Sequence, residues 1–321
     1  MMKLTLSNFN LILKKIFLHE NKPHVAIGVS GGPDSIALTY MLSKYLQQNN
    51  GNLIALVVDH QMRKQSAEEA KNTANYLREI CVNCKILKIP SNNLDKGKMS
   101  DARSFRFKKL FDYCKKNKIF HLFLGHHHDD NIETFLLRKT AGSNLEGLNC
   151  INEIAINGDV QIIRPFLKFT KNQILKFNHE NNLKYINDPT NKNFKYTRSI
   201  IRKYLSDNKK VITDIEKEFK IVKKYYSDYK KMVFKLLNIL VLDIKSKTII
   251  IDFLKIQKLN PEIQIKIFDL SIKFLKGSNI PTRAKKTANI INFLKNPRSR
   301  HFKSYDINFE KSGTFLSLTL N

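Results

Sequence analysis

The residues of this sequence best suited to chemistry lie in one short segment: Ser30, Gly31, Gly32, Pro33, Asp34 and Ser35. The apolar run before it, residues 24–29, predicts a strand, and a helical pattern begins near Ile36. A strand that turns through two glycines into a helix points backbone N–H groups and the positive helix end at one place, which suits phosphate. The segment lacks the Lys and the length of the GxxxxGK[ST] loop. An ordinary turn is the structural alternative, because Ser, Gly and Asp also favour turns and N-caps.

Two more predicted turns carry unusual side chains. One is Val58-Asp59-His60-Gln61-Met62-Arg63, and the other, residues 125–134, has the sequence GHHHDDNIET. Three histidines and two carboxylates at a predicted helix start suggest metal binding or acid–base chemistry. The structural alternative is that Asp is favoured at a helix N-terminus by the helix dipole alone.

The elements that must position these turns alternate between apolar runs and helical patterns. We expect a parallel sheet with helices on both faces, an α/β fold, because strands rich in Val, Ile and Leu alternate with amphipathic helices. Ligands on such sheets bind at the carboxyl ends of the strands, so the turns after Val29, Val58 and Leu124 should meet at one crevice. The expected strands are residues 24–29, 53–58, 85–89, 120–124 and a fifth around 161–163, and the expected helices are residues 36–46, 66–80, 102–116 and 129–139.

The pattern changes near residue 210. A long Lys-rich helical stretch covers residues 212–240, helix-like pieces follow at 261–275 and 283–294, and residues 301–320 alternate as a strand does. We therefore expect a catalytic domain over residues 1–211. A smaller, mainly helical α+β domain is expected over residues 212–321.

The composition indicates a polyanionic partner. The 321 residues include 56 Lys and Arg against 28 Asp and Glu, a net charge of +28, which favours a partner such as RNA, DNA or an anionic membrane surface. The four cysteines form no disulfide framework. No signal peptide and no apolar run of membrane-spanning length is evident, so we expect a cytoplasmic protein with no membrane partner.

With these segments together, the sequence resembles the N-type ATP pyrophosphatases, and within them the tRNA(Ile)-lysidine synthetases. The Asp-His-x-x-Arg turn and the later Asp-x-[ST]-Asn…Tyr-x-Arg…Ile-Arg pattern single out that family. Asn131 departs from its pattern where Gln is expected, and Cys150-Ile151 departs where Gly-Met is commoner. The matching segments are residues 30–35, 58–63, Ala102, Arg103, Arg106, Phe107, residues 125–134, Ala141-Gly142, residues 146–148, 164–167 and 188–191, and Tyr196, Arg198, Ile201 and Arg202.

The resemblance implies a two-step ligation. ATP adenylates the carbon-2 oxygen of the wobble cytidine in tRNA(Ile) with a CAU anticodon, which releases pyrophosphate. The amine of free L-lysine then displaces AMP and leaves lysidine. ATP is thus implied as a substrate, with Mg²⁺ as its metal, and whether the protein forms a homodimer is left open.

Each residue type fits a role in this reaction. ATP binding is expected from Ser30, Gly31, Gly32, Pro33, Asp34 and Ser35, and from Val58, His60 and Arg63 at the nucleotide. Asp34 would hold Mg²⁺ through the ATP phosphates. Arg103 and Arg106, three apart on a helix, would neutralise the triphosphate or the tRNA backbone.

Lysine carries two ammonium groups and needs acidic partners, for which we expect Asp130 and Glu133. His127 or His128 would accept a proton from the amine, and the structural alternative is a histidine that only bonds nearby backbone. tRNA contact is expected where basic and aromatic side chains interleave. These residues are Lys195, Tyr196, Arg198, Arg202 and Lys203.

Two alternatives remain open. One is another tRNA-modifying ATP pyrophosphatase, of the 2-thiocytidine type, which would need cysteines near the crevice for an iron–sulfur cluster. Cys81 and Cys84 precede a predicted strand and Cys114 lies on a predicted helix, so that placement is not evident. The other is a basic RNA-binding protein that has lost catalysis, although every carboxylate, Arg and Gly that the chemistry needs is present.

Overall fold

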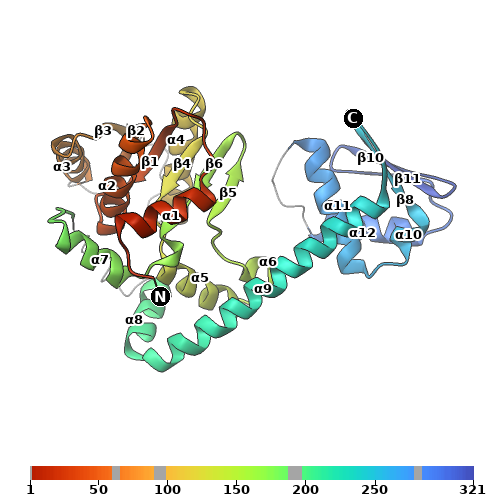
Figure 1. Ribbon diagram of the computed structural model, residues 1–321. Coiled ribbons are helices and arrows are strands. Elements are labelled where there is room, and N and C mark those ends of the chain that lie inside the picture. The colour runs from red at the N-terminus through yellow and green to blue at the C-terminus, as the bar shows by residue number, and fades with distance from the viewer. Residues whose placement is uncertain (1, 60–65, 90–98, 187–196, 278–283) are drawn as a thin grey trace. The chain divides into compact units, whose positions relative to one another are not determined.

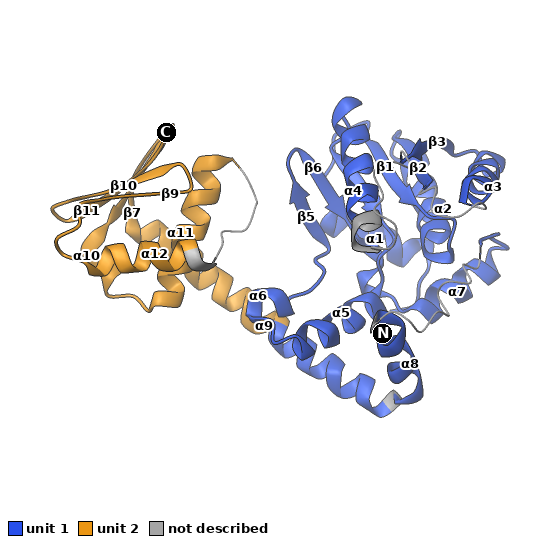
Figure 2. Ribbon diagram, turned by 180° about the vertical axis from the view of Figure 1, so that it is seen from behind, with its two compact units in different colours: residues 1–222 blue, residues 223–321 orange. Residues whose placement is uncertain are grey.

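A computed structural model describes residues 2–59, 66–89, 99–186, 197–277 and 284–321. The chain divides into two compact units, residues 1–222 and 223–321 (Figure 2). The boundary falls inside one long helix, α9 (Lys209–Leu240), and the boundary expected from the sequence, after residue 211, lies near the start of the same helix.

In the described part of unit 1, six strands form a mixed sheet in the order β3-β2-β1-β4-β6-β5 (Figure 1). Every neighbouring pair is parallel except β5 and β6, which form an antiparallel pair at one edge. The expected parallel sheet is confirmed, and β5 is the strand that the sequence did not predict. The strands are β1 (His24–Val29), β2 (Asn52–Asp59), β3 (Asn83–Lys88), β4 (His121–Leu124), β5 (Ile154–Asn157) and β6 (Val160–Ile163).

Helices cover both faces of this sheet, as the α/β class requires (Figure 1). Those following β1, β2, β3 and β4 match the four predicted helices, whereas α1, α6, α7 and α8 were not predicted. The helices are α1 (Leu6–Ile16), α2 (Pro33–Gln48), α3 (Ser66–Glu79), α4 (Met99–Lys116), α5 (His128–Thr140), α6 (Leu145–Leu148), the 3₁₀ helix η2 (Pro165–Lys168), α7 (Lys171–Glu180) and α8 (Thr197–Asp207).

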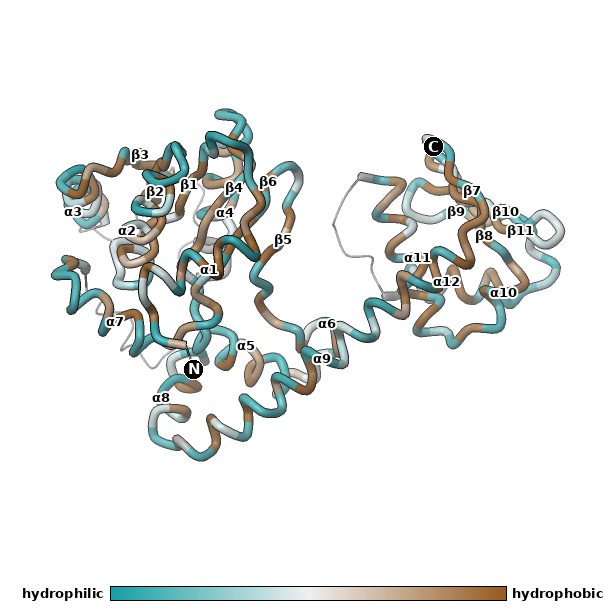
Figure 3. Tube along the Cα trace, viewed as in Figure 1, coloured by the Kyte–Doolittle hydropathy of each residue, from teal (hydrophilic) through white to brown (hydrophobic). Residues whose placement is uncertain are grey.

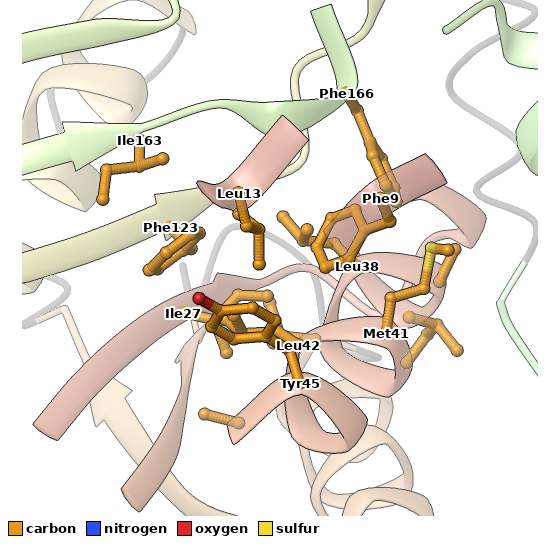
Figure 4. Packing of buried hydrophobic residues seen from close by; sticks show 14 of the residues in the cluster. Phe9, Leu13, Ile27, Leu38, Met41, Leu42, Tyr45, Phe123, Ile163 and Phe166 are labelled. Atoms are coloured by element: carbon orange, nitrogen blue, oxygen red, sulfur yellow. The ribbon is translucent and has the colours of Figure 1, made fainter. Parts of the chain in front are cut away.

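Alternating side chains of β1 belong to two cores. Ile27, with its neighbours two residues away on the strand, packs with α1, α2 and α7, whereas Ala26 packs with α4 on the other face. In Figure 4, side chains from α1 and α2 point toward the sheet residues Ile27, Phe123 and Ile163. The rings of Phe9 on α1 and Phe166 on η2 meet edge to face, with centroids 5.9 Å apart. Helix α1 therefore closes the core over α2.

The strand order creates a switch point beside β1. The chain runs outward from β1 to β2 and β3 on one side and returns to β4 on the other. The loops after β1 and β4 consequently leave the same edge of the sheet in opposite directions, which is where open α/β sheets bind ligands.

Unit 2 contains an antiparallel sheet and helices. Its described strands follow the order β7-β8-β11-β10-β9, and the core brings together side chains from α9, α11, α12 and the sheet. The expected α+β class is confirmed. The elements are β7 (Val241–Lys245), β8 (Thr248–Asp252), α10 (Phe253–Gln257), α11 (Pro261–Lys276), α12 (Ala284–Lys295), β9 (His301–Ser304), β10 (Ile307–Ser312) and β11 (Phe315–Leu320).

Helix α9 contributes to the cores of both units. Ile215 and Phe219 pack with Ile132 and Phe135 of α5, whereas the later part of the helix enters the unit 2 core at Val233. Figure 3 shows the resulting alternation of hydrophobic and hydrophilic residues along α9. Within the described residues, none of the helices is both long and apolar enough to cross a bilayer.

The packing of α1 predicts a large cost for truncating Phe9. This side chain is fully buried, so Phe9→Ala should lower the free energy of unfolding by about 3–5 kcal/mol. Leu11→Ala on the same helix is the matched control, because Leu11 is 52% exposed and its loss should change stability by less than about 1 kcal/mol. Urea unfolding followed by circular dichroism measures both. Equal effects of the two variants would contradict the packing of α1 described above.

Candidate active site

The loop after β1 needs glycine at Gly31. Its φ is +80°, and a Cβ built there would lie 2.5 Å from the hydroxyl oxygen of Thr73 on α3. The Gly31 carbonyl accepts a hydrogen bond of 2.9 Å from the backbone N–H of Ile186. The loop is thus held from both sides in a conformation that other residues would strain.

Ser35 closes this loop on itself. Its hydroxyl donates to the Gly32 carbonyl at 2.9 Å, and it accepts from the Ser30 N–H at 3.3 Å. Gly32 is the N-cap of α2 and Pro33 follows it at the first helical turn. The segment is therefore a tight strand-to-helix turn at a helix N-terminus, as the sequence predicted.

The loop after β4 runs directly against the loop after β1. A Cβ at Gly125 would lie 3.2 Å from the carbonyl carbon of Asp34, so the two backbones are in close contact. From α7, the side chain amide of Asn178 donates to the Pro33 carbonyl at 3.0 Å. The start of α2 is thereby fixed against both the β4 loop and α7.

This contact brings the predicted carboxylates together. The Asp130 Oδ2 accepts a hydrogen bond of 3.0 Å from the His127 backbone N–H. The Nε2 of the buried His127 lies 3.6 Å from that oxygen and 3.9 Å from the Oδ1 of Asp34. Asp34 of α2 and Asp130 of α5 therefore flank one histidine ring.

The surroundings keep the α5 carboxylates ionised. Burial opposes the charge of Asp130, but His127, His126 and the guanidinium of Arg198 outweigh it and lower the pKa of this carboxyl group. The pKa of Asp129 is also lowered, since the His128 side chain and the Lys171 backbone N–H offset its burial. The centre therefore holds concentrated negative charge.

Lys171, which the sequence interpretation missed, supplies a cation to this centre. Its Nζ lies 2.7 Å from each carboxylate oxygen of Asp34. Its backbone N–H, at the start of α7, donates to the Oδ2 of Asp129 at 3.0 Å. The sequence offers only a weak signal for this residue, a basic side chain at the first position of a helix, where the dipole disfavours it.

Two arginines of α8 bind Glu133. Arg202 donates to both of its oxygens, at 2.7 and 3.0 Å, and the Nε of Arg198 donates at 3.1 Å. Arg198 also lies 3.5 Å from Asp130. The hydrogen bond to Glu133 raises the pKa of Arg202. Glu133 is buried, so this forked pairing holds α8 against α5.

His128 connects the centre to α9. Its Nδ1 lies 3.5 Å from the Oδ1 of Asp129 and 3.7 Å from the Oε1 of Glu216. Its backbone N–H donates to the Phe169 carbonyl at 2.9 Å. The ring is mostly buried between two carboxylates.

The other predicted residues are placed as follows. Val58 is the half-buried penultimate residue of β2, beside Asp59, whose carboxylate accepts a 2.9 Å hydrogen bond from Ser66. Arg106 on α4 lies with its guanidinium 5.5 Å from the Phe107 ring centre, and Lys203 is exposed on α8. Arg103 belongs to α4, but its side chain lies outside the described part of the structure. Also outside the described residues are His60, Arg63, Lys195 and Tyr196.

The donor set at Asp34 fits a magnesium ion bound together with phosphate. Its carboxylate already binds a cation, the Lys171 ammonium, and carboxylate oxygens are the ligands that Mg²⁺ prefers. Within the described ranges, no group of three or more His, Cys, Asp or Glu side chains is placed to hold a metal ion. Mg²⁺ normally takes one or two carboxylates and completes its shell with water and substrate phosphates, so these residues suit it.

Two of the four cysteines have thiols with raised pKa values. Burial raises the pKa of the Cys84 thiol to about 11 and that of Cys114 to about 12. Both thiols therefore stay protonated near neutral pH, as buried structural cysteines do. None of the four cysteines is in a disulfide.

Comparison with known proteins identifies the family of the chain. The model of the PP-loop domain family matches residues 5–209. The chain belongs to this family. Its fold also resembles a solved structure, the U34-tRNA thiolase NcsA from Methanococcus maripaludis with its [4Fe-4S] cluster. That likeness has a TM-score of 0.57 and 22% identity, over 68% of this chain and 78% of the other, and it concerns the fold alone.

Three curated relatives that the chain matches carry the name tRNA(Ile)-lysidine synthase. That of Orientia tsutsugamushi is 37% identical over 190 residues, which are 58% of this chain and 42% of the relative. That of the Wolbachia of Brugia malayi is 36% identical over 213 residues, 65% of this chain and 49% of the relative. That of Rickettsia typhi is 28% identical over 293 residues, 90% of this chain and 65% of the relative. The chain spans about half the length of the first two.

The geometry of Gly31 predicts a specific effect on nucleotide binding. Gly31→Ala should weaken ATP binding about tenfold or more, because left-handed backbone strain and the contact with Thr73 displace the loop. Gly142→Ala is the matched control, since Gly142 also has a positive φ but no heavy atom lies within 4 Å of the position that its Cβ would take. Calorimetric titration with Mg²⁺-ATP measures both. A loss of affinity in the control, or none in Gly31→Ala, would contradict this role of the loop.

The lowered pKa of Asp130 predicts an acid-dependent stability. Its ionised form stabilises the folded chain fully above the ordinary carboxyl pKa, about 3.9, and this contribution disappears as the pH falls through the lowered pKa. Asp130→Asn should therefore be less stable than the natural chain at pH 7, and the gap should close below about pH 4. Urea unfolding across this range measures the gap. A gap that is independent of pH would show that the charge of Asp130 is not involved.

Proposed function

We propose that this chain ligates L-lysine to carbon 2 of the wobble cytidine of tRNA(Ile) with a CAU anticodon, at the expense of ATP. The observation that carries the proposal is the contact between the phosphate-type loop at Asp34 and the acidic start of α5 at Asp130. It would join a site for a triphosphate to a site for an ammonium group. The shared name of the curated relatives supports the same reaction.

In the first step the cytidine carbon-2 oxygen attacks the α-phosphorus of ATP, and pyrophosphate leaves. The loop residues Ser30, Gly31, Gly32 and Ser35 would bind the leaving phosphates through N–H and hydroxyl groups at the N-terminus of α2. Val58, His60 and Arg63 would border the nucleotide. Arg103 and Arg106 would stabilise the negative charge that develops during transfer.

Asp34 would hold Mg²⁺, which when bound neutralises phosphate charge. The Asp34 carboxylate lies at the first turn of α2, beside the loop that would bind the phosphates. Asp34 would therefore hold the metal ion close to the phosphates that the loop would bind.

In the second step the lysine amine attacks carbon 2, and AMP leaves. Asp130 is better suited than Glu133 to contact the incoming ammonium directly. Three hydrogen bonds from arginines already occupy the oxygens of Glu133, and a carboxylate accepts about four. Glu133 would then act mainly by positioning Arg198 and Arg202. His128 would accept the proton from the attacking amine, and its contacts with Asp129 and Glu216 would stabilise the resulting charge.

The tRNA would contact the basic surface around α8. Lys203 is exposed there, and Lys195 and Tyr196 precede the helix in sequence. The guanidinium groups of Arg198 and Arg202 donate hydrogen bonds to Glu133. We expect the solvent-exposed parts of the same two side chains to contact RNA. A phosphate close to α8 would then lie near Asp130, the carboxylate that would contact the amino acid.

Thiolation of tRNA is the second candidate, because the U34-tRNA thiolase shares the fold of this chain and a fold alone does not separate the two reactions. That protein is described with an iron–sulfur cluster. Among the described residues of this chain, no group of three or more His, Cys, Asp or Glu side chains is placed to hold a metal ion, so the described structure offers no support for such a cluster. Ligation of lysine is therefore the better supported function.

The test is incorporation of radiolabelled lysine into an unmodified tRNA(Ile) transcript with a CAU anticodon. We expect label only when Mg²⁺-ATP is present, together with AMP and pyrophosphate in equal amounts. A tRNA(Met) transcript with the same anticodon is the control and should remain unlabelled. Asp34→Ala should lower the rate at least a hundredfold, because it removes a charge at the reacting phosphates.

Other outcomes would point elsewhere. Formation of AMP and pyrophosphate without incorporation of lysine would support an adenylating enzyme and would exclude lysine as the donor. Neither product, with tRNA binding retained, would favour a basic RNA-binding protein without catalysis.

A further inference from the structure

Lys171 occupies a position that its own helix does not favour. It is the first residue of α7, where the helix dipole is positive and a cation is destabilising. The carboxylate of Asp129 bonds its backbone N–H, but the Lys171 side chain points to a different carboxylate, that of Asp34. The position of this ammonium is therefore explained by Asp34 and not by helix capping.

The ammonium lies where a bound cation would lie. Its Nζ is 2.7 Å from both oxygens of Asp34, a symmetric arrangement like that of a cation bound by both oxygens of one carboxylate. The Lys171 side chain is 32% exposed and that of Asp34 is 25% exposed, so both can be reached from solvent. Because the ammonium of Lys171 lies against both oxygens of Asp34, it occupies the position that a metal ion bound by this carboxylate would take.

The backbone at Lys171 is fixed while its side chain is not. Thr170 and Gln173 form a capping box at the start of α7, and Asn178 ties the helix to the Pro33 carbonyl. The lysine stem has four rotatable bonds. The ammonium can thus leave Asp34 without any movement of α7, and it remains tethered beside the loop.

We propose that Lys171 is a phosphate-binding residue that neutralises Asp34 before the nucleotide arrives. When ATP brings a divalent cation to Asp34, the ammonium moves to the phosphates of ATP. Two cations then neutralise the triphosphate: the divalent ion held by Asp34 and the ammonium group of Lys171. This inference rests on the ATP site of the proposed function and is independent of lysine and tRNA.

The proposal predicts opposite effects on two ligands. Lys171→Met removes a competing cation from Asp34, so binding of a metal alone should tighten, by about threefold to tenfold. It also removes a charged phosphate contact, so binding of Mg²⁺-ATP should weaken, by roughly tenfold or more. A purely structural ion pair would shift both affinities in the same direction or neither.

The measurement uses Mn²⁺ as the metal probe, titrated into the full chain without nucleotide and followed by electron paramagnetic resonance. Calorimetry with Mg²⁺-ATP gives the second affinity, and urea unfolding establishes that each variant is folded. Lys176→Met is the matched control, because Lys176 lies on the same helix, is exposed and pairs only weakly with Glu180 among the described residues. It should change neither affinity. Lys171→Arg should retain ATP binding, since the charge is kept.

The same substitution in an Asp34→Asn variant tests whether the metal ion binds at Asp34. In Asp34→Asn, the further change Lys171→Met should no longer tighten Mn²⁺ binding, because the carboxylate for which the two cations compete is gone. Mn²⁺ binding that is unchanged, weakened or absent in Lys171→Met, or an unchanged affinity for Mg²⁺-ATP, would overturn the proposal. Failure of lysine ligation in the natural chain would contradict the proposed function and leave these binding results intact.

Discussion

The site depends on the close approach of two backbones at the switch point of the sheet. Gly125, after β4, lies so near Asp34 that a side chain there would press on the start of α2. This contact sets the distance between the phosphate-type loop and the acidic turn of α5. Since β1 and β4 pair directly, the register of two strands fixes the separation of two chemical groups. Rigid elements position such groups more precisely than loops alone.

Charge compensation is the second constraint. Asp34, Asp129, Asp130 and Glu133 converge, and concentrated negative charge of this kind is stable only with nearby cations. The cations come from α7 and α8, helices that are remote in sequence from the carboxylates. The site is thereby assembled from four separate helices.

The sequence identified the candidate site residues more completely than the helices that hold them in place. The five parallel strands of unit 1, the helices that follow the first four of them and the loop at residues 30–35 were evident because apolar periodicity and glycine placement act locally. Helices α1, α7 and α8 were missed, since their signals are short amphipathic patterns between polar stretches. Lys171 was missed with α7: its partner, Asp34, is a long-range neighbour that no spacing rule reveals. The pairing of Glu133 with Arg198 and Arg202 was hidden for the same reason, although all three residues had been singled out.

Helix α9 carries one row of apolar residues spaced in alternating steps of four and three from residue 215 to residue 240. The residues of this row are buried or half-buried, and they are Ile215, Phe219, Val222, Tyr226, Tyr229, Val233, Leu236 and Leu240. Inserting or deleting one residue in the middle would turn every later position by about 100° around the helix axis. The apolar positions beyond the change would then no longer continue the row before it. Substitutions on the outer face leave that row intact, so this helix should tolerate changes of residue type far better than changes of length.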